Sequence, residues 1–353
     1  MKKILLSSAA VLGLVAFSPA ANAQDGGLSL DAGGHFKGYG VISDQDENNG
    51  DVKDVDWLQE TEIHLSGETT LDNGLTVGAH VEAEADGAGG NGDSFNVDES
   101  YAYFAGGWGR VNLGNEDGAA YLLQVSAPSA DSNIDGIRQY VQPVNYNSLS
   151  TVFGGPSGTN INNVQFDYAN DATTENNKLT YLSPNVQGFQ AGVSYTPQLG
   201  GNTRDLDGVN IDDDDSLEDA WELAARYEGD FDRLGVNLGA GYIVANEGDN
   251  AMNVEDDLEE WNIGADFDWG PLGLGAVYTE SNNALDQAGD TETWVAGLDY
   301  TTGSFKIGGS YYTQDSEAGV VDGSGAGFGS QIVGTAAISV IGGIGDELET
   351  DRW

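Results

Sequence analysis

The stretch LDNGLTVGAHVEAEAD, residues 71–86, decides the fold. After its turn residues, apolar side chains occupy every second position from Leu75 to Ala85, and Thr, Gly, His, Glu and Asp fill the positions between them. Such alternation predicts a β-strand with one apolar and one polar face. In a soluble sandwich the apolar face would meet a core, whereas in a membrane barrel it would meet lipid and the acids would line water.

The turn before this strand determines its pairing with the preceding segment. A three-residue loop at 72–74 pairs Leu65 with Val81 and His64 with Glu82, so that paired side chains share a face. A two-residue Asn-Gly loop would pair apolar with acidic side chains, and we reject it. The longer loop also puts Gly74 in the left-handed position that favours glycine. The polar face of this hairpin then carries His64, His80, Glu82 and Glu84.

Strand-like segments recur along the whole chain, and none shows a sustained helical period. We count 14 of them, at residues 28–43, 57–70, 75–86, 97–106, 109–115, 177–183, 189–196, 220–229, 235–246, 259–269, 272–280, 292–301, 304–314 and 329–341. Short turns alternate with long acidic connections rich in Asn and Gly, and Trp or Tyr often ends an apolar series. Both features are typical of a barrel in an asymmetric membrane with aromatic girdles.

One connection, at about residues 116–175, is too long for an ordinary loop and should be functional. In a barrel it could fold into the lumen. Its segments 122–125 and 164–168 could form short strands, which would raise the strand count.

The N-terminus predicts a secretory signal peptide at residues 1–23. Lys2 and Lys3 precede an apolar run at 4–17, and Ala21-Asn22-Ala23 is a small-x-small cleavage site. The mature chain, residues 24–353, is then an exported protein. Its remaining apolar runs are shorter than a membrane-spanning helix, so a place in the membrane would require a closed barrel.

The composition excludes several classes of function. The chain has no Cys, which rules out thiolate chemistry and disulfides. It has 58 acidic residues against 12 Lys and Arg, a balance that repels nucleic acid and concentrates cations. The same acids could equally serve solubility or adaptation to salt.

The residues that could carry chemistry do not form a known catalytic pattern. The three histidines, His35, His64 and His80, lack the spacing of a local zinc motif, and we favour ordinary lumen-lining residues over a metal site for His64 and His80. No G-x-S-x-G motif supports a serine hydrolase. We therefore expect no enzyme, no metal site and no cofactor. The acidic stretch at 210–222 lacks the EF-hand order of ligands, so only loose Ca²⁺ or Mg²⁺ association is plausible there.

The few basic residues are informative because they stand among so many acids. By alternation Arg110 and Arg226 fall on the polar face, and we place Lys37 and Lys178 there too. Each could simply pair with a neighbouring acid. Several inward bases opposite an acidic loop would instead set up a transverse field across a pore.

Three stretches resemble the general outer-membrane porins of alphaproteobacteria. They are DESYAYFAGGWGRVNLGNEDGAAY at 98–121, NNKLTYLSPNVQGFQAGVSYTP at 176–197 and ETTLDNGLTVGAHVEAEAD at 68–86, and the likeness extends from about residue 28 to 314. It implies an all-β transmembrane antiparallel barrel of 16 strands, usually trimeric, with an inward-folded third loop whose acids narrow the pore. By this resemblance the constriction candidates are Glu116, Asp117, Asp131 and Asp135.

The C-terminus departs from that family. Its last residues, GGIGDELETDRW at 342–353, end in an aromatic residue, but Glu349 and Asp351 stand where apolar residues are expected. Two strands hidden in the long connection, a smaller barrel or an altered tail would each reconcile our 14 segments with the 16 that the resemblance implies.

Together these features predict an outer-membrane porin that lets small hydrophilic solutes and ions diffuse passively and prefers cations. Its partners would be outer-membrane lipid and lipopolysaccharide, two further copies of itself, and its solutes, but not nucleic acid. A secreted acidic β-sandwich or adhesin that binds Ca²⁺, and a substrate-specific outer-membrane channel, are the alternatives.

Overall fold

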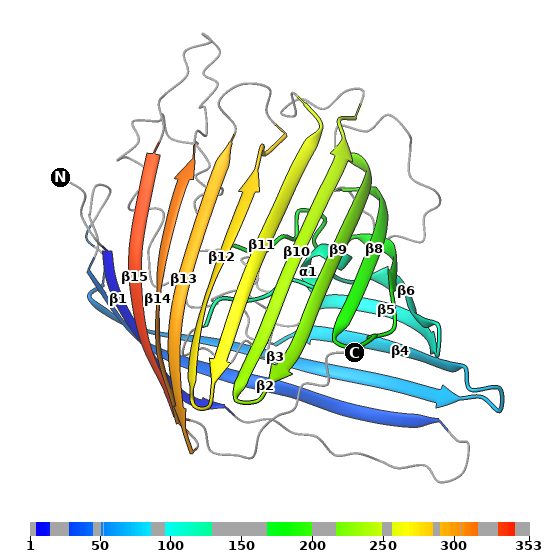
Figure 1. Ribbon diagram of the computed structural model, residues 1–353, viewed down its shortest axis with the longest axis horizontal. Helices are drawn as coiled ribbons and strands as arrows, with labels where there is room; N and C mark the ends of the chain where they lie inside the picture. Colours follow the sequence, from blue (N-terminus) through cyan, green and yellow to red (C-terminus); the bar gives the residue numbers. More distant parts are fainter. Residues whose placement is uncertain are drawn as a thin grey trace.

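The computed structural model describes residues 5–14, 28–44, 51, 53–85, 96–128, 168–199, 217–248, 256–284, 290–303, 305–316 and 331–342. All of their long elements are strands (Figure 1). The strands are β1 Leu5–Leu14, β2 Ser29–Asp44, β3 Val55–Thr70, β4 Thr76–Glu84, β5 Asn96–Gly106, β6 Gly109–Asn115, β7 Asn177–Leu182, β8 Phe189–Gln198, β9 Glu218–Phe231, β10 Leu234–Asn246, β11 Leu258–Trp269, β12 Leu272–Ser281, β13 Thr291–Thr302, β14 Phe305–Ser316 and β15 Gln331–Gly342.

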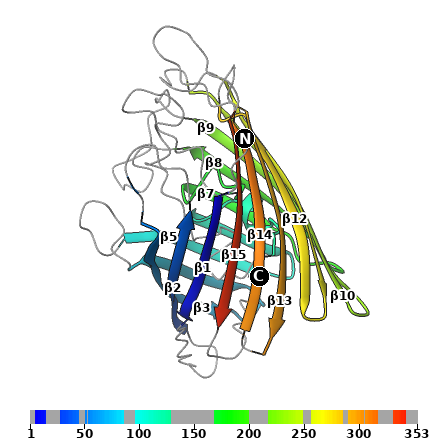
Figure 2. The ribbon, with the colours of Figure 1, turned by 90° about the vertical axis from the view of Figure 1, so that its left-hand side faces the viewer.

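Each of the 14 segments found in the sequence corresponds to one strand, from β2 to β15, which confirms their prediction. These strands pair with their neighbours in chain order, and every pair is antiparallel. β1 pairs antiparallel with β2 and parallel with β15, which closes the strand order into a ring (Figure 2). β1 therefore comes from the segment that we predict to be the signal peptide.

One short helix interrupts the strands. α1, Ala119–Leu122, lies in the long connection after β6, so residues 122–125 end a helix and do not form the short strand that their sequence suggested. Within the described ranges no helix is long and apolar enough to cross a membrane. Residues 129–167 and 343–353, where further strands or an altered tail would fall, lie outside the described part of the chain.

The hairpin of β3 and β4 has the predicted register. Leu65 pairs with Val81 and His64 with Glu82. The amide of Gly74 donates to the carbonyl of Leu71 at 2.8 Å, and Gly74 adopts φ +81°. Turn geometry and the alternation of side chains thus select the same pairing. A register shifted by one residue would pair the apolar side chains of one strand with the polar side chains of the other.

Most of the large apolar side chains of the sheet point outward. On β9, Trp221 and Leu223 are exposed, whereas Glu222 between them is buried. The same alternation holds at Trp261, Ile263, Leu274, Trp294, Leu298 and Tyr311. This is the reverse of a soluble protein, in which large apolar residues are mostly buried. It is the pattern of a barrel wall whose outer face contacts lipid. The chain forms one continuous sheet instead of the two facing sheets of the sandwich alternative.

Candidate pore lining and the loop on its inner wall

The inner face of the sheet is polar. Buried polar side chains on this face come from strands all around the ring: Glu62, Asn112, Thr180, Ser194, Glu222, Asn262, Thr279, Thr293 and Ser310. They alternate with the exposed apolar residues because successive side chains on a strand point to opposite faces. The wall therefore offers hydrogen-bonding groups to whatever occupies the interior.

The start of the long connection lies against this inner wall. α1 contacts β7, β8, β9 and β10, and residues up to Pro128 continue along the next strands. Inward-facing glycines make the close approach possible: a Cβ on Gly239 would lie 2.8 Å from Val125 Cγ2, and one on Gly297 would lie 1.8 Å from the Pro128 carbonyl oxygen. The expectation that this connection folds inward is therefore met for residues 116–128.

The returning arm of the connection is fixed to the first arm and to the wall. The Tyr168 carbonyl accepts hydrogen bonds from Gln124 Nε2 at 2.8 Å and from Thr279 Oγ1 at 2.9 Å. The amide of Asn170 donates to Gln124 Oε1 at 2.8 Å. Tyr168, Gln124 and Asn170 are almost fully buried. These contacts make residues 116–128 and 168–176 one packed layer inside the barrel.

Two charged wall residues lie beneath this layer. Lys178 Nζ donates to the carbonyls of Glu116 and Thr174, and the side chain is 3% exposed. Glu222 accepts hydrogen bonds from the Ala120 amide at 2.9 Å and from Thr173 Oγ1 at 2.5 Å. Lys178 thus lies on the inner wall as predicted, but its ammonium binds the loop and is covered by it.

Two successive side-chain contacts connect Arg110, on the wall strand β6, to Glu116, the first predicted constriction residue. Its Nε donates to Asn112 Oδ1 at 2.6 Å, and Asn112 Nδ2 contacts both carboxylate oxygens of Glu116, at 2.6 and 2.7 Å. The guanidinium lies 4.0 Å from the ring centre of Tyr103. This places Arg110 on the inner wall near Glu116.

The predicted constriction acids differ in their surroundings. Glu116 is 4% exposed, so it lies under the loop surface instead of projecting from it. Burial raises the pKa of Glu116 to about 7, although Asn112 and the charges of Arg110 and Lys178 act in the opposite direction. Asp117 is partly exposed, and its amide donates to Glu99 Oε1 at 3.3 Å. Asp131 and Asp135 lie outside the described residues.

The two remaining predicted bases, Arg226 and Lys37, lie in strands β9 and β2. Arg226 forms an ion pair with Glu228, two residues along β9. Lys37 is in β2, where its backbone is in register with Glu60, but its side chain is not among those described.

A row of three histidines crosses β2, β3 and β4 on the inner wall. The ring centres of His35 and His64 are 5.9 Å apart, and those of His64 and His80 are 5.8 Å apart. Glu62 and Glu82 lie between the rings: Glu62 Oε2 is 3.1 Å from His64 Nε2, and Glu82 Oε1 is 2.9 Å from His80 Nε2. Glu84 is the register partner of Glu62 on the next strand.

The turn register predicted that Glu62 shares the polar face of the hairpin with His64, His80, Glu82 and Glu84, but it did not predict His35 as a member of this row. A long connection joins β2 to β3, so no turn geometry fixes their register in advance. The available signal for His35 was the alternation along β2, where it has the same parity as Lys37, a residue that we place on the polar face.

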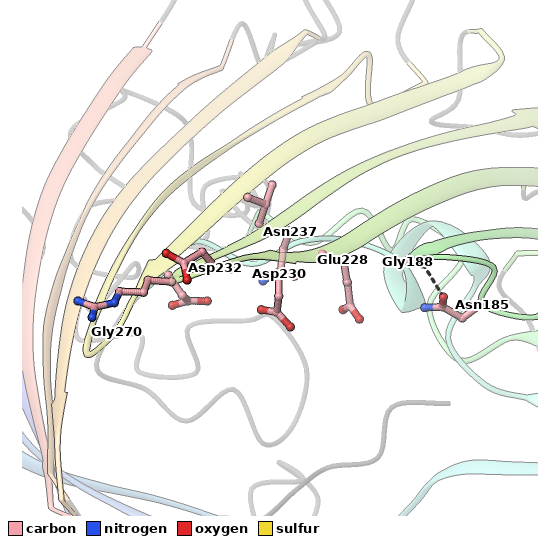
Figure 3. Close-up of a pocket in the computed structure, with 12 residues that line it drawn as sticks. Asn185, Gly188, Glu228, Asp230, Asp232, Asn237 and Gly270 are labelled. Carbon is pink, nitrogen blue, oxygen red and sulfur yellow. Dashed lines mark hydrogen bonds between the residues drawn. The ribbon is translucent and has the colours of Figure 1, made fainter.

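An open acidic hollow of about 720 Å³ lies at the end of the sheet where the short turns are (Figure 3). Its charged lining consists of Glu228, Asp230, Asp232, Arg233 and Asp268. In the close-up, the carboxylates of Glu228 and Asp230 project away from their strand. This hollow therefore presents mainly negative charge.

Comparison with known proteins agrees with this architecture. The profile of the Gram-negative porin family matches residues 8–332. The structure of Salmonella typhi OmpF in complex with daunomycin aligns with a TM-score of 0.55 at 20% identity, covering 89% of this chain and 87% of that one. At this identity the likeness concerns the fold alone.

Curated relatives match a shorter region. An uncharacterized protein of Rickettsia conorii is 28% identical over 126 residues, which is 33% of this chain and 29% of that protein. An uncharacterized protein of Rickettsia prowazekii is 31% identical over 116 residues, 29% of this chain and 26% of that protein. The matched regions thus span less than a third of these relatives.

Proposed function

This chain belongs to the Gram-negative porin family, and from that premise we propose that it is a passive diffusion channel for small hydrophilic solutes and ions that prefers cations. The observation that supports the proposal best is the inverted wall. Large apolar side chains such as Trp221 and Leu223 are exposed on the outer face, and polar side chains such as Asn262 and Thr293 line the inner one. Such a wall is stable only between lipid outside and a polar interior.

The cation preference is supported by the unequal surroundings of bases and acids. The Lys178 ammonium is covered by the loop, the Arg110 guanidinium lies over Tyr103, and Arg226 is paired with Glu228. Asp230 and Asp268, by contrast, are exposed at the turn end. With 58 acids against 12 bases in the whole chain, the field in the interior is negative. Such a field raises the local concentration of cations.

We place the narrow part of the pore at the layer formed by residues 116–128 and 168–176. This layer occupies interior space along β7 to β13 and is held by hydrogen bonds at both arms. Its partly exposed acids in the described range are Asp117, Asp171 and Glu175, and Asp131 and Asp135 remain proposals from the resemblance. No step of this function is a chemical reaction, so no residue is assigned a catalytic role.

The setting of the channel follows from the family. We propose export with removal of residues 1–23, insertion into the bacterial outer membrane among lipid and lipopolysaccharide, and assembly as a homotrimer. No cofactor is needed, although the acidic loops could hold Ca²⁺ or Mg²⁺ loosely. N-terminal sequencing of the membrane form and chemical cross-linking in outer-membrane vesicles test the first and last of these statements.

Single-channel recording of the purified protein in planar bilayers tests the function directly. We expect stepwise, long-lived conductance increments and, in a salt gradient, a reversal potential of the sign that indicates cation preference. Absence of conductance from protein that shows heat-modifiable migration would overturn the channel. A reversal potential of the opposite sign would leave the channel standing and reject its cation preference.

A further inference from the structure

We propose that the inner wall carries a binding site for a late first-row transition-metal dication of the Zn²⁺ type, with His64 Nδ1, His80 Nε2 and the Glu82 carboxylate as ligands. These three groups come from the adjacent strands β3 and β4, which run side by side in Figure 1. Their donor atoms all lie within 4.8 Å of one another.

The spacing of the donor atoms fits such an ion. Glu82 Oε1 is 3.0 Å from His64 Nδ1 and 2.9 Å from His80 Nε2. Tetrahedral coordination at the usual zinc–nitrogen and zinc–oxygen lengths places ligand atoms about 3.4 Å apart. Small side-chain rotations therefore suffice to admit the ion, because the ligands stand on two paired strands whose backbone positions are fixed.

In both ligand histidines, His64 and His80, the ring nitrogen that does not face the metal already has a hydrogen-bond partner. Glu62 Oε2 lies 3.1 Å from His64 Nε2, and Ser66 Oγ lies 3.2 Å from His80 Nδ1. An N–H on each of these nitrogens leaves the opposite nitrogen as a lone-pair donor for the metal. Carboxylates and hydroxyls in this outer position orient ligating histidines in known metal sites and strengthen binding.

The choice between the two halves of the histidine row follows from access. His35 and Glu62 could form a second group with His64, but both are almost fully buried. The ligands of the proposed site are 16% to 26% exposed, which leaves a fourth position open to the interior. A neutral His64 can give only one nitrogen to a metal, so one ion binds and the other nitrogen donates to a carboxylate.

The chemistry of the ligands sets this site apart from loose association at acidic loops. Two imidazoles and one carboxylate suit Zn²⁺, Co²⁺, Ni²⁺ or Cu²⁺, whereas Ca²⁺ and Mg²⁺ prefer oxygen ligands only. The chain has no Cys, and all three of its histidines are in this row. Binding with imidazole character can therefore arise nowhere else.

Titration of untagged, detergent-purified protein with Co²⁺ and with Zn²⁺, in the presence of millimolar Mg²⁺, tests the proposal without any channel recording. We expect one Co²⁺ per chain with the visible absorption of a nitrogen-ligated, low-coordinate site, displaced by Zn²⁺. His80→Gln should weaken binding more than 10-fold, and Ser66→Ala, which removes only an outer partner, by about 10-fold. His35→Gln should leave the affinity unchanged.

The variants also define what would overturn the site. Folding of each one is checked by heat-modifiable migration, and the wild-type titration needs no variant at all. The proposed metal site would be rejected if wild-type protein gave no saturable Co²⁺ spectrum. It would also be rejected if Mg²⁺ at equal concentration competed with Co²⁺. Loss of binding in His35→Gln with retention in His80→Gln would reject these ligands.

Discussion

The side-chain amide of Asn112 contacts both carboxylate oxygens of Glu116, at 2.6 and 2.7 Å, and both residues are buried. Asn112 belongs to the wall strand β6 and Glu116 to the loop that crosses the interior. This contact therefore fixes the first residue of the loop to the barrel. Burial raises the pKa of Glu116, and the hydrogen bond from Asn112 acts against that rise.

We predict that Glu116→Gln stabilises the protein at pH 8 and has little effect at pH 4. Burial raises the folded-state pKa of Glu116 to about 7 from a usual value of 4.5, so the folded state holds its proton longer than the unfolded state does. Stability is then lost as pH rises from the unfolded to the folded pKa. The loss amounts to about 3 kcal/mol when the group is fully ionised.

The unfolding temperature in detergent, measured by heat-modifiable migration, checks this at both pH values. Asp117→Asn serves as the matched control because Asp117 is partly exposed and the change removes the same charge next to Glu116. Equal destabilisation by Glu116→Gln at pH 4 and pH 8 would show that the carboxylate acts mainly as a hydrogen-bond acceptor.

Gly297→Ala should lower the single-channel conductance. A Cβ at this position would lie 1.8 Å from the carbonyl oxygen of Pro128, so the loop must move from the wall toward the pore axis. Overpacking of this kind costs about 1–3 kcal/mol. Gly107→Ala is the control, since a Cβ there meets no atom within 4 Å. If both variants conduct like the wild type, the loop does not limit the current.

The double change Glu228→Gln with Asp230→Asn should reduce the cation preference. Both carboxylates line the turn-end hollow, and their removal leaves Arg226 without its partner Glu228. The effect on the reversal potential should be larger at low salt, because screening is weaker there. The matched control removes two outward-facing charges on other strands, Glu259 and Glu292, by change to Gln. Equal shifts in both doubles would point to overall charge instead of the pore.

Zn²⁺ at micromolar concentration should lower both the current and the cation preference of the wild-type channel. This expectation rests on the proposed function and on the proposed metal site together. A bound dication adds two positive charges to the wall beside Glu82 and opposes cation entry. His80→Gln should abolish the response, whereas His35→Gln should keep it. Zn²⁺ binding by titration without a change in current would place the site away from the ion path.

The chain without residues 1–23 should close its barrel between β2 and β15. Ala9 of β1 is in register with Val41 of β2 and with Ser339 of β15, so removal of β1 leaves these two edges facing each other as an antiparallel pair. An unpaired edge in lipid is costly, which drives the closure.

Engineered cysteines can test this closure because the chain has no Cys of its own. In protein that starts at Gln24, Val41→Cys with Ser339→Cys should form a disulfide. Val41→Cys with Val295→Cys, which joins β2 to the more distant β13, should not. If conduction requires residues 5–14, and the disulfide between positions 41 and 339 does not form, then β1 is part of the barrel wall.

The strands could be predicted because each one carries its own signal. Alternation of apolar and polar residues is local, and it located all of β2 to β15 and the register of β3 with β4 through the turn at 72–74. The register of β2 with β3 could not be predicted, since a long connection leaves the pairing to contacts made elsewhere. His35 and Glu62 were therefore missed as neighbours.

The surroundings of the residues under the loop could not be predicted from the sequence either. Alternation placed Lys178 on the inner wall, but its burial by Glu116 and Thr174 depends on how the loop folds back. For Glu222, the sequence indicates only a polar position between Trp221 and Leu223. Glu222 accepts a hydrogen bond from the Ala120 amide, and these two residues are 102 positions apart in the chain.

The amino-acid sequence by itself determined the strands of this protein, the apolar and the polar face of each strand and the large excess of acidic over basic residues. These properties follow from local alternation and composition, which act whatever the strands pair with. Only the tertiary structure decided which inward residues become neighbours. The pairing of β2 with β3 and of β3 with β4 brought three histidines into one row, and packing the loop onto inward glycines covered Lys178 and Glu222. Both results depend on register and loop path, which local patterns do not encode.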